Sequence, residues 1–141
     1  KVTSQVSIIA AKKIVRECLT EQQKQLGLNG GLVAEGRDIG TAVFPYAELK
    51  IFLTASETER AKRRAKDFEA RGYNVPKLSD IEKEIRERDE LDRKREIAPL
   101  IKANDAIEVI TDGMSINEVV IKLVNLFHEK VPSEVWPHRA N

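Results

Sequence analysis

The stretch GLVAEGRDIGTAVFP, residues Gly31–Pro45, decides how the rest of the sequence is interpreted. Its short apolar start, Gly31–Glu35, predicts a buried strand. Arg37 and Asp38 follow that strand, where ligands bind in a parallel sheet. An arginine offers a planar fork to a phosphate, and an aspartate can accept from the amino group of a base. A ligand site is therefore one interpretation, and a salt bridge between these two neighbours is an equally good one.

Outward from this stretch, strands and helices alternate along the chain. Apolar runs predict two more strands, at Leu49–Leu53 and Ala106–Thr111. Helices are predicted, from apolar spacing and end residues, at Val2–Leu26, at Glu57–Arg71, from a cap at Ser79 or Asp80 to about Arg95, and at Ser115–Lys130. This order favours an α/β fold, with a short parallel sheet and flanking helices.

The ends and faces of these helices give more specific expectations. Ser56, with Glu57 and Glu59 after it, is typical of an N-cap. The tail Pro132–Asn141, which contains Trp136, is expected to be extended. The last helix is expected to carry six apolar residues on its inner face: Ile116, Val119, Val120, Leu123, Val124 and Phe127.

Composition limits the class of protein. The 141 residues, 41% of them hydrophobic and 33% charged, suit one soluble domain. The formal net charge of +1 gives no general reason to bind nucleic acid or a membrane. A single cysteine, Cys18, excludes a disulfide within the chain. The helical pattern already under way at Lys1 predicts that the chain is a fragment.

Charged residues in two helices are further candidates. Arg88, Asp92 and Arg95 share one face of the predicted third helix and could hold a phosphate beside a ribose hydroxyl. By itself the pattern favours surface ion pairs on an exposed helix. The basic run Arg60–Arg64 could clamp a polyphosphate or could simply be solvated. No aromatic residues are interleaved with it, which argues against nucleic acid. His128 and His138 are expected on the surface.

Several stretches, in this order, resemble the cytidylate kinase family of nucleoside monophosphate kinases. They are SIIAAKKIVR (Ser7–Arg16), AEGRDIGTAVFP (Ala34–Pro45), KIFLTAS (Lys50–Ser56), ERAKRR (Glu59–Arg64), ERDELDRKREIAPL (Glu87–Leu100) and NDAIEVITDGMSINEVV (Asn104–Val120). The opening TSQVS and the closing VPSEVWP look most like cyanobacterial fusions of a pantoate–β-alanine ligase with a cytidylate kinase. The resemblance implies one partial P-loop-type kinase domain in a cytoplasmic enzyme, spanning residues 1–141.

The resemblance also implies roles for particular residues. Ser7, Arg16 and Asp38 would contact the cytosine ring. Residues 1–26 would form the end of the CMP-binding region. The phosphate falls to Arg37, Arg88 and Arg95, and the ribose hydroxyls to Asp92. Residues 57–76 would form a mobile lid over ATP, with Arg60 and Arg64 facing it. The implied reaction moves the γ-phosphoryl group of ATP, accompanied by Mg²⁺, to CMP or dCMP.

The sequence departs from the family pattern in two places. It contains no Gly-Lys pair, and therefore no G-x-x-x-x-G-K-[ST] phosphate loop. We therefore expect the central strand that carries this loop to be absent, and these residues alone to be catalytically silent. They could still bind CMP weakly, or self-associate through the exposed sheet. The second departure is Lys12-Lys13, where the family often has a proline, and this predicts one continuous first helix.

Overall fold

The computed structural model describes Ile9 and residues 12–136. Ser7, His138 and the outer parts of the opening and closing segments lie outside the described residues. In chain order the elements are α2 (Lys13–Leu26), the π-helix η1 (Ile39–Val43), β1 (Ile51–Thr54), α3 (Glu57–Ala70), α4 (Leu78–Arg93), β2 (Ile107–Ile110), α5 (Ile116–Lys130) and the 3₁₀ turn η2 (Ser133–Val135).

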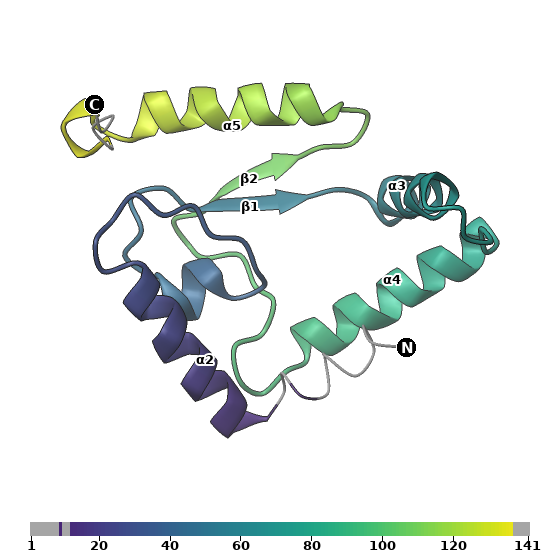
Figure 1. The fold of residues 1–141 in the computed structure, drawn as a ribbon, viewed down its shortest axis with the longest axis horizontal. Coiled ribbons are helices and arrows are strands. Elements are labelled where there is room, and N and C mark those ends of the chain that lie inside the picture. Colours follow the sequence, from purple (N-terminus) through teal and green to yellow (C-terminus); the bar gives the residue numbers. More distant parts are fainter. Residues whose placement is uncertain (1–8, 10–11, 137–141) are drawn as a thin grey trace.

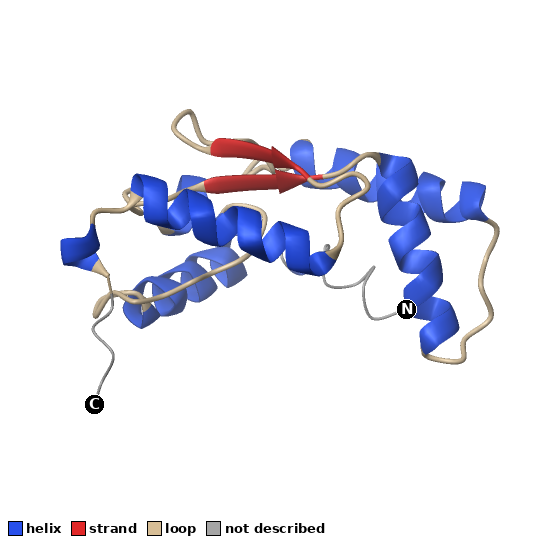
Figure 2. Ribbon diagram, turned by 90° about the horizontal axis from the view of Figure 1, so that it is seen from above, coloured by secondary structure: helices blue, strands red, loops and turns tan. Residues whose placement is uncertain are grey.

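Two parallel strands form the sheet. β1 pairs with β2 in a register that sets Ile51 opposite Ile107 and Thr54 opposite Ile110. α5 runs alongside β2, whereas α3 and α4 extend beyond the carboxyl end of β1 (Figure 1). The same arrangement is seen from above in Figure 2. The predicted α/β class and parallel sheet are confirmed, although each strand is shorter than predicted.

The predicted strand at Gly31–Glu35 is wrong. These residues form an exposed loop without regular structure, and the side chain of Val33 is 99% exposed. A strand needs hydrogen bonds from a neighbour, and in the described part of the chain β1 and β2 pair only with each other. The apolar composition of this segment could not reveal that no strand lies beside it.

The first helix is not continuous, contrary to the expectation from Lys12-Lys13. Lys12 has φ −72° and ψ 124°, an extended conformation, and α2 begins after it at Lys13. Ile9 is helical on the other side of this break. A helix requires φ and ψ near −63° and −42° at every residue, so the extended ψ of Lys12 interrupts it.

Serine side chains cap two other helices, one of them at the predicted Ser56 and the other at Ser115. The Ser56 hydroxyl accepts from the Glu59 N–H (3.2 Å) at the start of α3. Ser115 and Glu118 form a reciprocal capping box before α5. The start predicted for α4 is wrong, because its N-cap is Lys77, which makes no side-chain cap. α4 also ends at Arg93, so Arg95 lies beyond the helix.

A buried apolar cluster lies between α3 and α4. Ala61 contributes from α3, Ile81 and Ile85 contribute from α4, and Ala65 and Phe68 pack around them. These two helices therefore make a small core of their own, away from the sheet. No helix in the described residues is both long and apolar enough to cross a membrane.

The apolar face of α5 is not buried as predicted. Ile116, Val120 and Val124 are exposed, because the described sheet offers α5 only two short strands to cover. The tail also differs from the extended form predicted for it, in the part that the structure describes. After η2, Trp136 turns back, its indole N–H donates to the Val131 carbonyl (2.9 Å), and its ring packs 5.7 Å from that of Phe127.

Candidate phosphate site

Three arginines surround one buried carboxylate at the end of α4. Asp92 is 1% exposed and lies in the last turn of that helix. Arg95 forms an ion pair with Asp92 Oδ1. Arg37 Nε lies 3.0 Å from Oδ2, and Arg88 Nε lies 4.0 Å from the same oxygen. The structure therefore brings Arg37 together with Arg88, Asp92 and Arg95, the four residues that the sequence singled out for a phosphate and its ribose.

The chain reverses direction after α4 and Arg95. The N–H of Leu100 donates to the backbone carbonyl of Asp92 (2.8 Å), which reverses the chain. Within the turn Ala98 has φ 52°, a conformation that L-residues seldom adopt. Arg95 contacts Asp92 from just beyond the end of α4 rather than from the shared helix face that was predicted.

The electrostatics of this arginine cluster favour an anion. Three guanidinium groups face one carboxylate, so the cluster carries about two unbalanced positive charges at neutral pH. Within the described residues, Arg88 Nε and Asp92 Oδ2 are buried and lack a hydrogen-bond partner. A phosphate oxygen could accept from the first, and a hydroxyl group could donate to the second. The alternative of surface ion pairs on an exposed helix does not fit, because Asp92 is buried.

Arg37 and Asp38 do not form the salt bridge that was the alternative at this position. Arg37 turns toward Asp92, whereas the buried Asp38 forms an ion pair and hydrogen bond with Arg16 of α2. Arg16 also borders a pocket of about 400 Å³, whose apolar wall includes Ala42, Ile97 and Ala98. An aspartate–arginine pair beside an apolar wall could recognise a planar polar ring.

The basic face of α3 meets acidic residues of α4. Arg60 Nη2 lies 2.7 Å from Asp89 Oδ2, and Arg64 Nη2 lies 3.6 Å from Glu84 Oε2. The alternative of a purely solvated helix is therefore wrong for Arg60. Sequence reasoning missed Asp89, although its place three residues before Asp92 puts both on one helix face.

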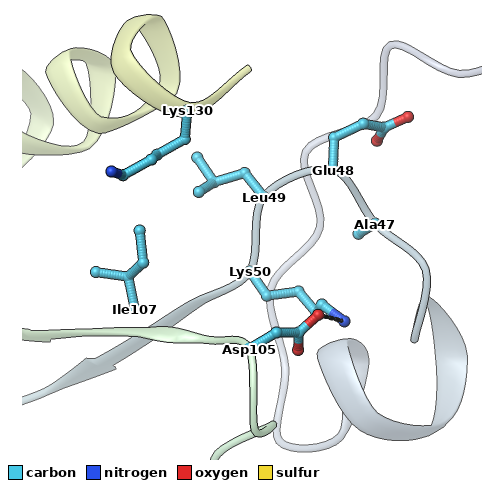
Figure 3. A pocket seen from close by; sticks show the side chains of 7 residues that line it. All are labelled: Ala47, Glu48, Leu49, Lys50, Asp105, Ile107 and Lys130. Carbon is cyan, nitrogen blue, oxygen red and sulfur yellow. Dashed lines mark ion pairs between the residues drawn. The ribbon is translucent and has the colours of Figure 1, made fainter. Parts of the chain in front are cut away.

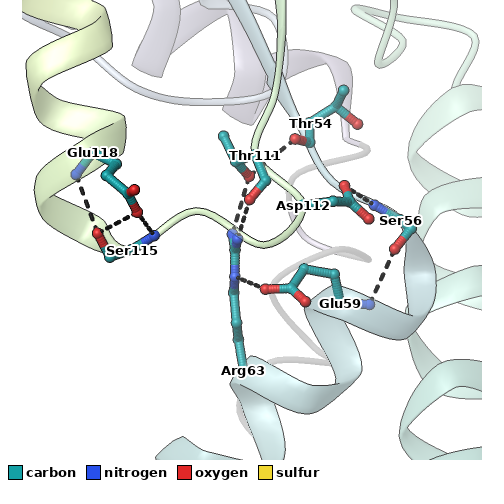
Figure 4. Close-up of polar contacts among 8 residues, drawn as sticks. All are labelled: Thr54, Ser56, Glu59, Arg63, Thr111, Asp112, Ser115 and Glu118. Atoms are coloured by element: carbon teal, nitrogen blue, oxygen red, sulfur yellow. Dashed lines mark hydrogen bonds and ion pairs between the residues drawn. The ribbon is translucent and has the colours of Figure 1, made fainter.

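Sequence reasoning also missed Arg63, which ties α3 to the sheet (Figure 4). Its guanidinium donates to the hydroxyl and the carbonyl of Thr111, at 3.1 and 2.5 Å, and to Glu59 at 2.8 Å. Nearby the Ser56 N–H donates to Asp112 Oδ2 (2.9 Å). Hydrogen bonding from Ser56 lowers the pKa of Asp112 below its usual value. The base of α3 is therefore fixed at the carboxyl ends of both strands.

A second pocket lies at the opposite, amino ends of the strands (Figure 3). It measures about 340 Å³ and is lined in part by Lys50, Asp105 and Lys130. The buried ammonium of Lys50 is paired with Asp105 (2.5 Å) and donates to the Pro45 carbonyl. This pairing lowers the pKa of Asp105 and compensates the lysine charge, so the pocket is a weaker candidate for an anion site.

A metal site is not evident in the described residues. No group of three or more histidine, cysteine, aspartate or glutamate side chains lies close enough together there to hold an ion. We therefore assign no step of a mechanism to a metal held by these side chains.

The described residues combine a short parallel sheet flanked by helices with a cluster of arginines at the end of α4. The sequence profile of cytidylate kinase matches residues 1–129, and the chain belongs to the cytidylate kinase family. A bifunctional pantoate ligase/cytidylate kinase from Prochlorococcus marinus is 68% identical over 139 residues, which are 99% of this chain and 27% of that relative. Another protein of that name, from a Synechococcus species, is 60% identical over 136 residues, 96% of this chain and 28% of the relative. The chain thus spans little more than a quarter of the length of these relatives.

Proposed function

We propose that this chain forms the nucleoside-monophosphate site and the lid of an enzyme that transfers the γ-phosphoryl group of ATP to CMP or dCMP. The convergence of Arg37, Arg88 and Arg95 on buried Asp92 is the observation that carries this proposal. It supplies a local excess of positive charge, as a phosphate dianion requires. Membership of the cytidylate kinase family gives the substrate class, and the products would be CDP or dCDP.

In this proposal the arginine cluster binds the phosphate of CMP and Asp92 receives a ribose hydroxyl. The buried Asp92 also holds the guanidiniums in place before the substrate arrives, which lowers the entropy lost on binding. Arg16 and Asp38, together with Ser7, contact the cytosine ring. An aspartate that accepts from the exocyclic amino group would be left unpaired by a uracil carbonyl, so it would discriminate against UMP.

The proposed mechanism needs no covalent intermediate on a side chain. Phosphoryl transfer depends on alignment of the two substrates and on cations that offset charge on the transferred oxygens. Residues 57–76 would act as the lid, and Arg60 and Arg64 would face the polyphosphate of ATP. ATP would arrive with Mg²⁺, to which we assign no step. We expect an enzyme with these substrates to work in the cytoplasm.

We further propose that the 141 residues alone bind CMP without turning it over. The reason is that they contain no Gly-Lys pair to form a G-x-x-x-x-G-K-[ST] loop for the triphosphate. Titration calorimetry of this polypeptide with CMP, and with AMP for comparison, is the direct test. We expect heat from CMP only. Equal binding of both nucleotides, or of neither, would contradict the assigned site.

Two substitutions tie this test to the arginine cluster. Arg88→Met removes a guanidinium at the phosphate, and we expect CMP affinity to fall by about tenfold or more. Arg71→Met, on an exposed residue just after α3, removes the same charge outside the cluster and is the matched control. CMP-dependent ADP release from the 141 residues alone would refute their predicted lack of catalysis.

Self-association is a second candidate property. It is favoured by the apolar side chains that the described sheet and α5 leave exposed, among them Leu53, Ile110 and Val120. Apolar surface and unpaired strand edges are common sites of association between chains.

A further inference from the structure

Two buried aspartates stand one turn apart on α4. Asp92 belongs to the arginine cluster, and Asp89 lies outside it. The Asp89 side chain is 8% exposed, and its Oδ2 lies 2.7 Å from Nη2 of Arg60 on α3. A buried carboxylate is costly unless a charge or hydrogen bonds compensate it, so Asp89 and Arg60 depend on each other.

One nitrogen of the Arg60 guanidinium is paired with Asp89, and another nitrogen is still available to donate a hydrogen bond. Its Nη2 faces Asp89, whereas its Nε is buried and has no hydrogen-bond partner among the residues that the structure describes. Arg64, one turn further along α3, is held more loosely, because it lies 3.6 Å from a glutamate that is largely exposed. Arg60 is therefore the better fixed of the two lid arginines.

The Arg60–Asp89 ion pair is not needed to hold α3 and α4 together. Ala61, Ile81 and Ile85 already bury an apolar core between α3 and α4. Buried ion pairs often stabilise a fold no better than apolar side chains of the same size. Because Asp89 contacts only one edge of the Arg60 guanidinium, the contact suggests that Asp89 orients the Arg60 side chain.

We propose that Asp89 is a positioning residue that holds Arg60 for the polyphosphate of a nucleoside triphosphate. The inference rests on the proposed function. Asp89 and Asp92 are three residues apart on one rigid helix, so α4 fixes where Arg60 stands relative to the arginine cluster. A single helix would then set the spacing between the cation on the donor nucleotide and the cations on the acceptor phosphate, as in-line transfer requires.

Steady-state kinetics of the full-length protein that carries this chain provide the test. Asp89→Asn keeps the size of the side chain and removes its charge. We expect the KM for ATP to rise about tenfold or more, and the KM for CMP to stay within about twofold. Asp80→Asn, on an exposed residue in the first turn of α4 and outside the proposed lid, makes the same chemical change and should alter neither value. Equal ATP KM values for the two variants would overturn the inference.

A double-substitution cycle separates positioning from stability. If Asp89 acts through Arg60, adding Asp89→Asn to Arg60→Gln should raise the ATP KM no further. Additive effects would contradict the inference. If Asp89→Asn lowers the urea midpoint, Asp89→Glu, which keeps the charge at a different reach, must show the same selective rise in ATP KM. Absence of CMP-dependent ADP release from the unsubstituted protein would instead refute the proposed function itself, and the inference with it.

Discussion

At the residue scale, Asp92 is the group on which the candidate phosphate site depends. It collects guanidiniums from the loop before η1, from α4 and from the turn after α4. Without a ligand, this carboxylate is what compensates the mutual repulsion of the three arginines. Its removal should therefore affect both stability and binding.

We predict that Asp92→Asn lowers the free energy of unfolding by about 3 kcal/mol, the usual effect of removing one partner from a buried charge cluster. Urea denaturation followed by circular dichroism measures it. Added inorganic phosphate should restore part of the loss, because the anion can replace the missing negative charge. An unchanged urea midpoint would show that the arginines do not need this carboxylate.

The contribution of the Asp112 carboxylate to stability is expected to depend on pH. Hydrogen bonding from Ser56 lowers the pKa of Asp112 in the folded protein below the unfolded value of 3.8. Its stabilising contribution is therefore complete above that unfolded value, and it is lost as pH falls through the lower, folded pKa. The difference in unfolding free energy between the wild-type protein and Asp112→Asn should be constant near neutral pH and shrink below about pH 4. A difference that grows on acidification would be contrary to this contact.

At the element scale, hydrogen-bonding caps start two of the helices, and a third helix starts without a side-chain cap. The serine hydroxyls of Ser56 and Ser115 accept from N–H groups at the starts of α3 and α5. Ser79 has the sequence features of a cap but lies within α4, whose N-cap is Lys77. Replacing each of these three serines by alanine therefore compares two capping serines with one that does not cap a helix.

We predict that Ser56→Ala and Ser115→Ala each lower the free energy of unfolding by about 1 kcal/mol, because each leaves a helix N–H without its acceptor. Ser79→Ala should change it by less than about 0.5 kcal/mol, as expected of an exposed side chain. Thermal unfolding of the three variants tests the set. A loss at Ser79 as large as that at Ser115 would contradict the observed start of α4.

A second prediction at this scale concerns Arg63, which connects α3 to Thr111 just after β2. Arg63→Met keeps the length of the side chain but cannot donate to Thr111 or Glu59. We expect faster amide hydrogen exchange at the first turn of α3 and at Thr111, and little change within the core around Ile81. Lys62→Met, on the exposed side of the same turn, is the control. Equal exchange in both variants would count against this attachment.

At the scale of the whole molecule, two parts are joined chiefly by charged and polar contacts. α3 and α4 share an apolar core of their own, and they meet the remainder through Arg63–Thr111, Ser56–Asp112 and Arg37–Asp92. Polar contacts of this kind can re-form at a different angle with less loss than a packed apolar interface. The arrangement would let α3, with the lid proposed at residues 57–76, and α4 move together relative to the sheet.

The exposed apolar surface predicts a concentration-dependent molecular mass for the 141 residues. Light scattering after size exclusion should show dimers or larger species at high micromolar concentration. Ile110→Lys, which places a charge at the carboxyl end of β2, should shift the population toward the 15.9 kDa monomer. A constant monomer mass at every concentration would exclude self-association.

The sequence by itself determined the class of fold, the cap that starts α3, the apolar repeat of α5, and the family. These features depend on local patterning, because a capping serine and a repeat of apolar residues act within one or two turns. The sequence also singled out Arg37, Arg88, Asp92 and Arg95 as one group, and these residues do meet in the structure, while their role in binding stays a prediction.

Only the tertiary structure decided what each of those charges contacts. Arg37 pairs with the buried Asp92, 55 residues further on, whereas its neighbour Asp38 pairs with Arg16. The predicted strand at Gly31–Glu35 is a loop because strand formation requires a neighbouring strand, which the composition of a segment cannot supply. Asp89 and Arg63 went unrecognised for the same reason. Burial and long-range pairing are properties of the folded chain, and they determine which of many charged residues form a site.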